Sequence, residues 1–244
     1  LAVGSAAFAI TDVIRQISFE MIFPILLLAL VLSWLFAQSK LRGWSASIFL
    51  IIIGLVVTFI RVGELTAPLI ALIRVTFSTI WQILNLSPGD VADFSTLSLA
   101  FSEVYFGVGN LIAALADWVQ SLLDGLPLIN DLAISLLWCY GIWLLTSWAG
   151  WWFRRLEKPL IALLPVGIFS TAIMGYTWSE TFILGPMLFA ALLLFAYVNF
   201  NQSERSWKST EMDYPEDLPK EFSATSVAII FGIVVIALIV PSFP

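Results

Sequence analysis

Six long apolar segments, each without Asp, Glu, Lys, Arg or His in its interior, constrain this chain more than any other feature of its sequence. A helix rises about 1.5 Å per residue, so it needs about 20 apolar residues to cross the hydrocarbon core of a bilayer. Segments that meet or approach this length lie at 21–37, 45–60, 132–153, 160–176, 181–200 and 225–240. In lipid a helix satisfies all of its backbone hydrogen bonds internally. We therefore predict an all-α, polytopic transmembrane fold.

The composition agrees with lipid as the solvent. Hydrophobic residues make up 60% of the 244 residues and charged residues only 11%, whereas soluble domains average about half and about a quarter. We interpret 1–244 as a single transmembrane domain with about six full spans. The run 1–10 is too short to cross a bilayer, and we expect it to be the last half of a partial first span. Because the chain starts at Leu1 and stops at Pro244 directly after an apolar run, we expect a longer polypeptide.

The basic residues predict an orientation. Lys and Arg near the ends of spans are retained on the cytoplasmic side. If the loop after Ala37 lies inside, the inner segments carry eight basic residues, namely Lys40, Arg42, Arg154, Arg155, Lys158, Arg205, Lys208 and Lys220. The outer side then carries Arg15, Arg61 and Arg74. We therefore predict a multi-pass protein of the bacterial cytoplasmic (inner) membrane, whose carboxyl end leaves on the extracytoplasmic side.

The segment 64–131, on the predicted outer side, is too apolar for a solvated loop. From Thr66 to Asn85 apolar residues recur at helical spacing, and the turn signal Ser87-Pro88-Gly89-Asp90 follows. A second apolar stretch, 96–123, carries polar residues seven positions apart, at Glu103, Asn110 and Asp117, with Asp124 at its end. Seven residues are about two helical turns, so these side chains form one drifting stripe.

This polar stripe argues against burial of the stretch 96–123 in lipid. Each Asp at the centre of a bilayer costs about 2.5–3.5 kcal/mol on insertion scales. A helix that lies in the membrane interface avoids this cost by turning the stripe towards water. We therefore expect two interfacial amphipathic helices in 64–131, and a re-entrant hairpin stays open as the alternative. On the inner side, 201–223 mixes charges of both signs with two prolines and predicts a cytoplasmic linker or a partial helix.

Few residues offer chemistry. The chain has no histidine and one cysteine, Cys139, which lies inside an expected span. A thiol in lipid is a poor nucleophile, so we assign it no role. We predict no catalytic, cofactor-binding or metal-binding residue and no cofactor. The expected partners are membrane lipids and other membrane-protein subunits, and nothing in the sequence forms a basic nucleic-acid footprint.

Aromatic and basic residues meet at the end of the fourth expected span, in Trp151-Trp152-Phe153-Arg154-Arg155. Trp rings favour the headgroup boundary, where Trp34, Trp44, Trp148 and Trp178 are also expected. This junction is followed by further short motifs, namely Lys158-Pro159-Leu160, Ala162-Leu163-Leu164-Pro165-Val166-Gly167, Glu204-Arg205, Trp207 and Asp213-Tyr214-Pro215-Glu216-Asp217-Leu218.

With these motifs, 21–244 resembles the N-terminal membrane region of bacterial transglutaminase-like membrane proteins. In that family the helices precede an extracytoplasmic papain-like domain with a Cys-His-Asp triad, usually followed by one more span. The resemblance implies a membrane-anchoring domain, with any thiol acyltransferase or protease activity in a domain after Pro244. The triad has no counterpart in this chain, which has no histidine.

Two other functions stay open from the sequence. The chain could be a structural accessory subunit of a larger membrane complex, respiratory or photosynthetic. It could also be a fragment of a transporter, although the interiors of the six expected spans carry no Asp, Glu, Lys, Arg or His for a proton relay and the chain shows no convincing inverted repeat.

Overall fold

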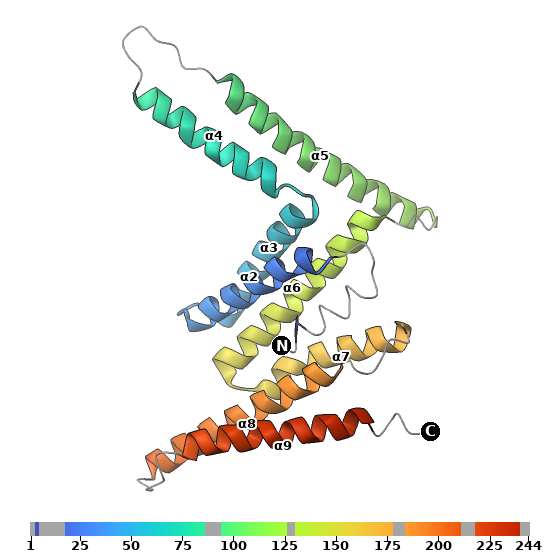
Figure 1. Ribbon diagram of the computed structural model, residues 1–244. Coiled ribbons are helices and arrows are strands. Elements are labelled where there is room, and N and C mark those ends of the chain that lie inside the picture. The colour runs from blue at the N-terminus through green and yellow to red at the C-terminus, as the bar shows by residue number, and fades with distance from the viewer. Residues whose placement is uncertain are drawn as a thin grey trace. The chain divides into compact units, whose positions relative to one another are not determined.

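The computed structural model describes residues 3–4, 18–85, 94–125, 130–177, 184–210 and 218–239, with the side chains of 173–177, 184 and 218–220 excepted. The elements in these ranges are helices (Figure 1): α2 (Phe19–Gln38), α3 (Gly43–Val62), α4 (Thr66–Leu84), α5 (Ser95–Leu123), α6 (Asp131–Leu156), α7 (Pro159–Thr177), α8 (Leu184–Ser209) and α9 (Leu218–Ile239). The all-α, multi-pass prediction is confirmed. The expected turn at 87–90, Trp178, 211–217 and most of 1–10 lie outside the described residues.

Six of the described helices are long and apolar enough to cross a membrane, and four of them coincide with the expected spans 21–37, 45–60, 132–153 and 225–240. The six are Phe19–Gln38, Gly43–Val62, Thr66–Leu84, Ser95–Leu123, Asp131–Leu156 and Glu221–Ile239. The other two are α4 and α5, which are expected from the sequence to be interfacial. Among the described residues α7 and α8 are not in this set, and the apolar part of α7, Pro159–Ala172, is shorter. Each of these pairs is consecutive. If both helices of a pair cross the membrane, or if neither does, every later loop therefore stays on the same side of the membrane.

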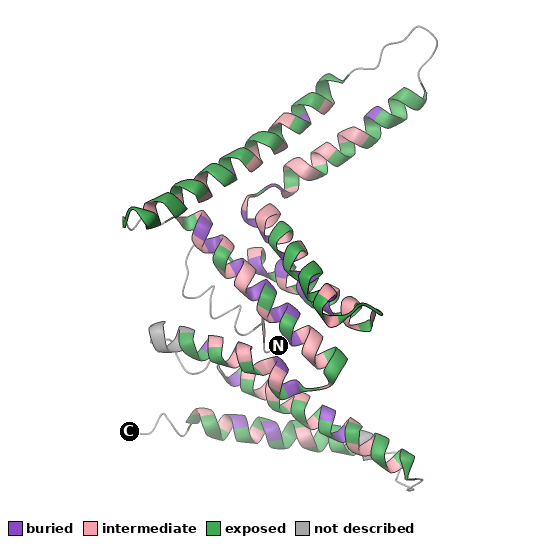
Figure 2. Cartoon of the chain, turned by 180° about the vertical axis from the view of Figure 1, so that it is seen from behind, coloured by how far each residue is buried: buried purple, intermediate pink, exposed green. Residues whose placement is uncertain are grey.

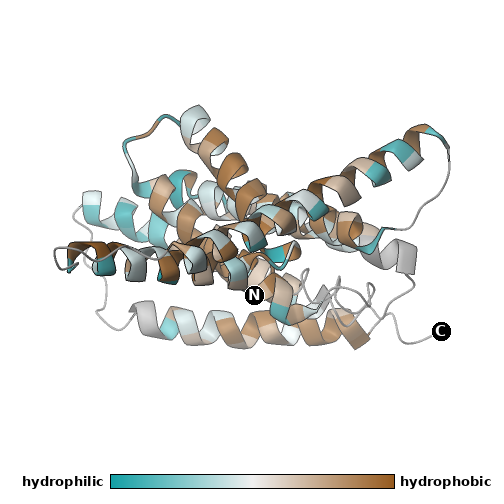
Figure 3. Cartoon of the chain, turned by 90° about the horizontal axis from the view of Figure 1, so that it is seen from above, coloured by the Kyte–Doolittle hydropathy of each residue, from teal (hydrophilic) through white to brown (hydrophobic). Residues whose placement is uncertain are grey.

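The segment 201–223, predicted to be a linker or a partial helix, is helical at both ends. Helix α8 runs on to Ser209, and α9 already begins at Leu218. Straight-chain residues such as Glu and Lys favour a helix, and Glu204 binds Lys208 one turn later at 2.8 Å. Helix α8 becomes polar towards its end, and the hydropathy of α9 changes in the opposite sense. Figure 3 shows α9 hydrophilic near its start and hydrophobic towards its end.

The contacts divide the chain into two compact units. Unit 1 comprises 1–52 and 141–244, and unit 2 comprises 53–140. The transmembrane domain 1–244 predicted from the sequence thus comprises two compact units. In unit 2, α4 and α5 form an antiparallel hairpin (Figure 1).

Two glycines allow the close packing in unit 2. A Cβ at Gly107 would lie 2.6 Å from Leu65 Cδ2, and a Cβ at Gly63 would lie 2.9 Å from Leu111 Cδ2. Asn130 ties the start of α6 to α5, because its Nδ2 donates to Ala114 O at 3.2 Å. Helix α5 therefore lies close to the turn between α3 and α4 at two glycines, which have no side chain.

The polar stripe of α5 faces away from the interior of the hairpin. Leu111 is buried and Val104, Val108 and Leu115 are half-buried, whereas all four members of the stripe are exposed, namely Glu103, Asn110, Asp117 and Asp124. The spacing of seven residues thus places these side chains on one face, as expected. Their exposure fits an interfacial helix, which stays a prediction.

In unit 1 the second half of α6 is a central part of the core. Ile142 and Thr146 are at most 1% exposed, and Figure 2 shows buried residues along α6. Trp143 is 0% exposed, and its Nε1 donates to Leu50 O of α3 at 2.9 Å. Helices α8 and α9 pack through Phe200 and Phe222, whose ring centroids lie 4.5 Å apart.

Candidate functional site

The loops predicted to be cytoplasmic come together in unit 1. Arg155 Nη1 donates to Leu41 O, between α2 and α3, at 3.0 Å. Arg205 of α8 binds Glu157, between α6 and α7, through two hydrogen bonds of 3.0 and 2.9 Å. These contacts gather exposed cationic side chains from three parts of the chain, which we call the basic end: Lys40, Arg42, Arg154, Arg155, Lys158, Arg205 and Lys208.

Tryptophans lie directly beneath two of these arginines. The Arg154 guanidinium lies 5.1 Å from the ring centroid of Trp34, and that of Arg155 lies 4.7 Å from Trp151. Both arginines occupy the last turn of α6, where a positive charge also interacts favourably with the helix dipole. The expected aromatic-to-arginine junction is thus a packed arrangement across α2 and α6.

The ion pair of Arg205 and Glu157 contributes little stability. The two side chains are 68% and 35% exposed, so water and salt screen their attraction. We expect Glu157→Gln to cost less than about 1 kcal/mol, which a thermal unfolding curve in detergent would detect as a shift of at most a few degrees. A loss much larger than this would show that Glu157 has a further structural role.

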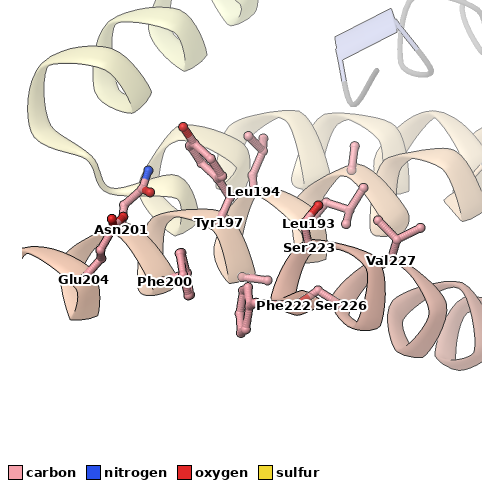
Figure 4. A pocket seen from close by; sticks show the side chains of 12 residues that line it. Leu193, Leu194, Tyr197, Phe200, Asn201, Glu204, Phe222, Ser223, Ser226 and Val227 are labelled. Carbon is pink, nitrogen blue, oxygen red and sulfur yellow. The ribbon is translucent and has the colours of Figure 1, made fainter. Parts of the chain in front are cut away.

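A groove of about 560 Å³ lies between α8 and α9 (Figure 4). Its walls are mainly apolar, with Tyr197, Asn201 and Glu204 of α8 at one end. The carboxylate of Glu204 binds Lys208 Nζ at 2.8 Å, so this charge is paired. The groove can therefore hold an apolar chain, and its one carboxylate already has a cationic partner.

A second pocket, of about 390 Å³, lies between α3 and α6 and is called the Ser147 pocket below. It is lined by Gly43, Ser47, Leu50, Ile51, Leu144, Ser147, Trp148, Trp151 and Trp152. The Ser147 hydroxyl is buried, and it has no hydrogen-bond partner among the described residues. Such a donor is costly to leave unpaired. Sequence reasoning missed this site, because serine is common in membrane helices and its partner depends on the neighbouring helix.

The cysteine and the acidic side chains of the described residues lie apart from one another. Cys139 is 0% exposed within α6, and no group of three or more His, Cys, Asp or Glu side chains gathers in these ranges. No protein-family model, no curated protein and no solved structure matches the chain. What the molecule does is therefore inferred from its own residues.

Proposed function

We propose that this chain is a membrane-anchoring domain whose basic end faces the cytosol of a bacterium and whose carboxyl end leaves on the outer side. The observation that carries the proposal is the contact of Arg155 with Leu41 and of Arg205 with Glu157. These contacts bring basic segments from three places in the chain to one end of unit 1. Basic residues at the ends of spans are retained on the cytoplasmic side, which supports this orientation.

The crossings of the later helices support the outer exit. If α6 ends at the basic end, α7 and α8 return the chain to that same end, as the pairing of Arg205 with Glu157 requires. Helix α9 then crosses once. Treating α4 and α5 as interfacial or as spanning leaves this result unchanged, because they form a consecutive pair.

The attached domain is proposed from the resemblance to transglutaminase-like membrane proteins. Acyl transfer through a thiol requires a thiolate and a nearby base. This chain has no histidine, and its one thiol is buried in α6. In the proposal an extracytoplasmic domain after Pro244 supplies Cys, His and Asp, and the present chain holds it at the membrane. The gene beyond codon 244 tests this point, and a stop codon there contradicts it.

Reporter fusions test the orientation. We expect alkaline phosphatase fused after Pro244 to be active, because this enzyme matures only outside the cytosol, and green fluorescent protein at the same site to stay dark. Fused after Thr210, which follows α8, the two reporters should give the opposite result. The Thr210 fusions are the matched control for expression. An active cytosolic reporter after Pro244 contradicts the proposal.

A structural subunit of a larger membrane complex is the second candidate, and the hairpin of α4 and α5 favours it. Phe77 and Trp81 of α4 are both 70% exposed, and the polar stripe of α5 is exposed as well. A neighbouring subunit with an apolar surface and polar groups opposite Glu103 and Asp117 would cover both. Purification in mild detergent separates the candidates, because a subunit retains its partners at fixed stoichiometry.

A further inference from the structure

Ser147 differs from the neighbouring hydroxyl residues of α3 and α6, and it shares with Ser170 of α7 a buried hydroxyl that has no partner among the described residues. Thr146 Oγ1 donates to Ile142 O at 2.7 Å, Thr58 Oγ1 to Gly54 O at 2.7 Å and Ser47 Oγ to Gly43 O at 2.9 Å. Each of them thus satisfies its hydroxyl on its own helix, four residues back. Ser147 is only 6% exposed, and its Oγ makes no such bond to any described residue. A buried donor of this kind needs an acceptor.

The pocket around Ser147 is graded from apolar to aromatic. Leu50, Ile51 and Leu144 form its apolar part, and Trp148, Trp151 and Trp152 line the rest. The aromatic part adjoins the basic end along α6, and Trp rings favour the boundary between acyl chains and headgroups. The order of these groups along α6 fits part of one lipid molecule, with an acyl chain beside the leucines.

Positive charge lies over the aromatic part. The Arg155 guanidinium is 4.7 Å from the ring centroid of Trp151, a wall of the pocket. It has five N–H donors in all, and Nη1 donates to Leu41 O at 3.0 Å. The nearby acid, Glu157, is bound by Arg205 at 2.9 Å. An anionic headgroup above this pocket would therefore face a cation and no unpaired carboxylate among the described neighbours.

We propose that the Ser147 pocket binds one anionic phospholipid of the leaflet at the basic end. Its acyl chain lies against Leu50, Ile51 and Leu144, the Ser147 hydroxyl donates to an ester carbonyl, and Arg155 faces the phosphate. Basic pockets between membrane helices on the cytoplasmic side bind anionic headgroups in this way. The inference rests on the membrane location and not on the nature of any attached domain.

The groove between α8 and α9 is larger but lacks the features that favour a lipid in the Ser147 pocket. Its carboxylate, Glu204, is paired with Lys208, and its walls show no unpartnered buried donor among the described residues. The hydroxyl of Ser147 is thus the feature that distinguishes the smaller pocket as a lipid site.

Titration with phosphatidylglycerol, followed by native mass spectrometry of the full chain in detergent, tests the proposal. We expect one phosphatidylglycerol to bind more tightly than phosphatidylcholine. Arg155→Gln should weaken phosphatidylglycerol binding about tenfold, since a charged hydrogen bond is lost, and Ser147→Ala about fivefold. Because Ser147→Ala removes only an oxygen, its helix content by circular dichroism should match that of the unaltered protein.

Neighbouring residues supply matched controls. Arg154→Gln removes the same charge but lies over Trp34 instead of a pocket wall, and Ser135→Ala removes a buried hydroxyl of α6 outside the pocket. We expect both to bind phosphatidylglycerol as the unaltered protein does. Equal weakening by Arg154→Gln and Arg155→Gln, or equal binding of the two lipids, overturns the proposal. Displacement of the lipid by glycerol phosphate at similar concentration overturns it too, because the acyl chain would then contribute nothing.

Discussion

Replacement of Trp143 by alanine is expected to destabilise this protein by about 3 kcal/mol, near the lower end of Trp→Ala losses in protein cores. The side chain is 0% exposed, so its removal leaves a void between α3 and α6. The hydrogen bond from Nε1 to Leu50 O, 2.9 Å long, is lost as well. Thermal unfolding in detergent should show a midpoint about 10 °C lower.

Two comparisons separate packing from exposure at Trp143. Trp143→Phe keeps a ring but removes the N–H, and we expect it to cost about 1 kcal/mol for the hydrogen bond plus some packing. Trp81→Ala, at a position that is 70% exposed, should change the midpoint by less than about 3 °C. If Trp81→Ala proves as damaging as Trp143→Ala, the assignment of the core to α6 is wrong.

Replacement of Gly150 by leucine is expected to have the second large effect, because α2 and α6 touch there. A Cβ at Gly150 would overlap Ser33 Oγ and lie 3.1 Å from Ser33 Cβ. The Ser33 hydroxyl is held in place by its hydrogen bond to Leu30 O at 2.9 Å. Since small residues allow membrane helices to approach closely, the larger side chain should separate the pair and cost about 3 kcal/mol or prevent folding.

Gly141→Leu is the matched control on the same helix. A Cβ at Gly141 meets no atom within 4 Å, so we expect its unfolding midpoint to stay within about 3 °C of the unaltered protein. The smaller variant Gly150→Ala keeps the test readable if Gly150→Leu does not fold. Adding Ser33→Gly to Gly150→Ala should recover more than half of the lost stability, since the clashing atoms are removed. Additive losses in the double variant would contradict the contact.

Much of the fold could be predicted from hydrophobic runs alone. Runs such as 45–60 must be helical in lipid, because in no other conformation does a single segment form all of its backbone hydrogen bonds internally. Helix lengths were harder to predict. Helix α8 continues to Ser209 through charged residues, since a helix does not have to end where its apolar run ends. Hydropathy also did not separate spanning from interfacial helices, since α4 and α5 are apolar enough for either.

The sequence by itself determined what each segment is: an apolar helix, a polar stripe, or a basic junction. These properties follow from composition and from the helical period, which are local. Only the tertiary structure decided which segments meet. It placed Arg155 against Leu41, opposed Gly150 to Ser33 and left the Ser147 hydroxyl without a partner on its own helix. Such contacts depend on how helices distant in the chain cross, and in an almost uniformly apolar sequence many crossings have similar hydrophobic energy.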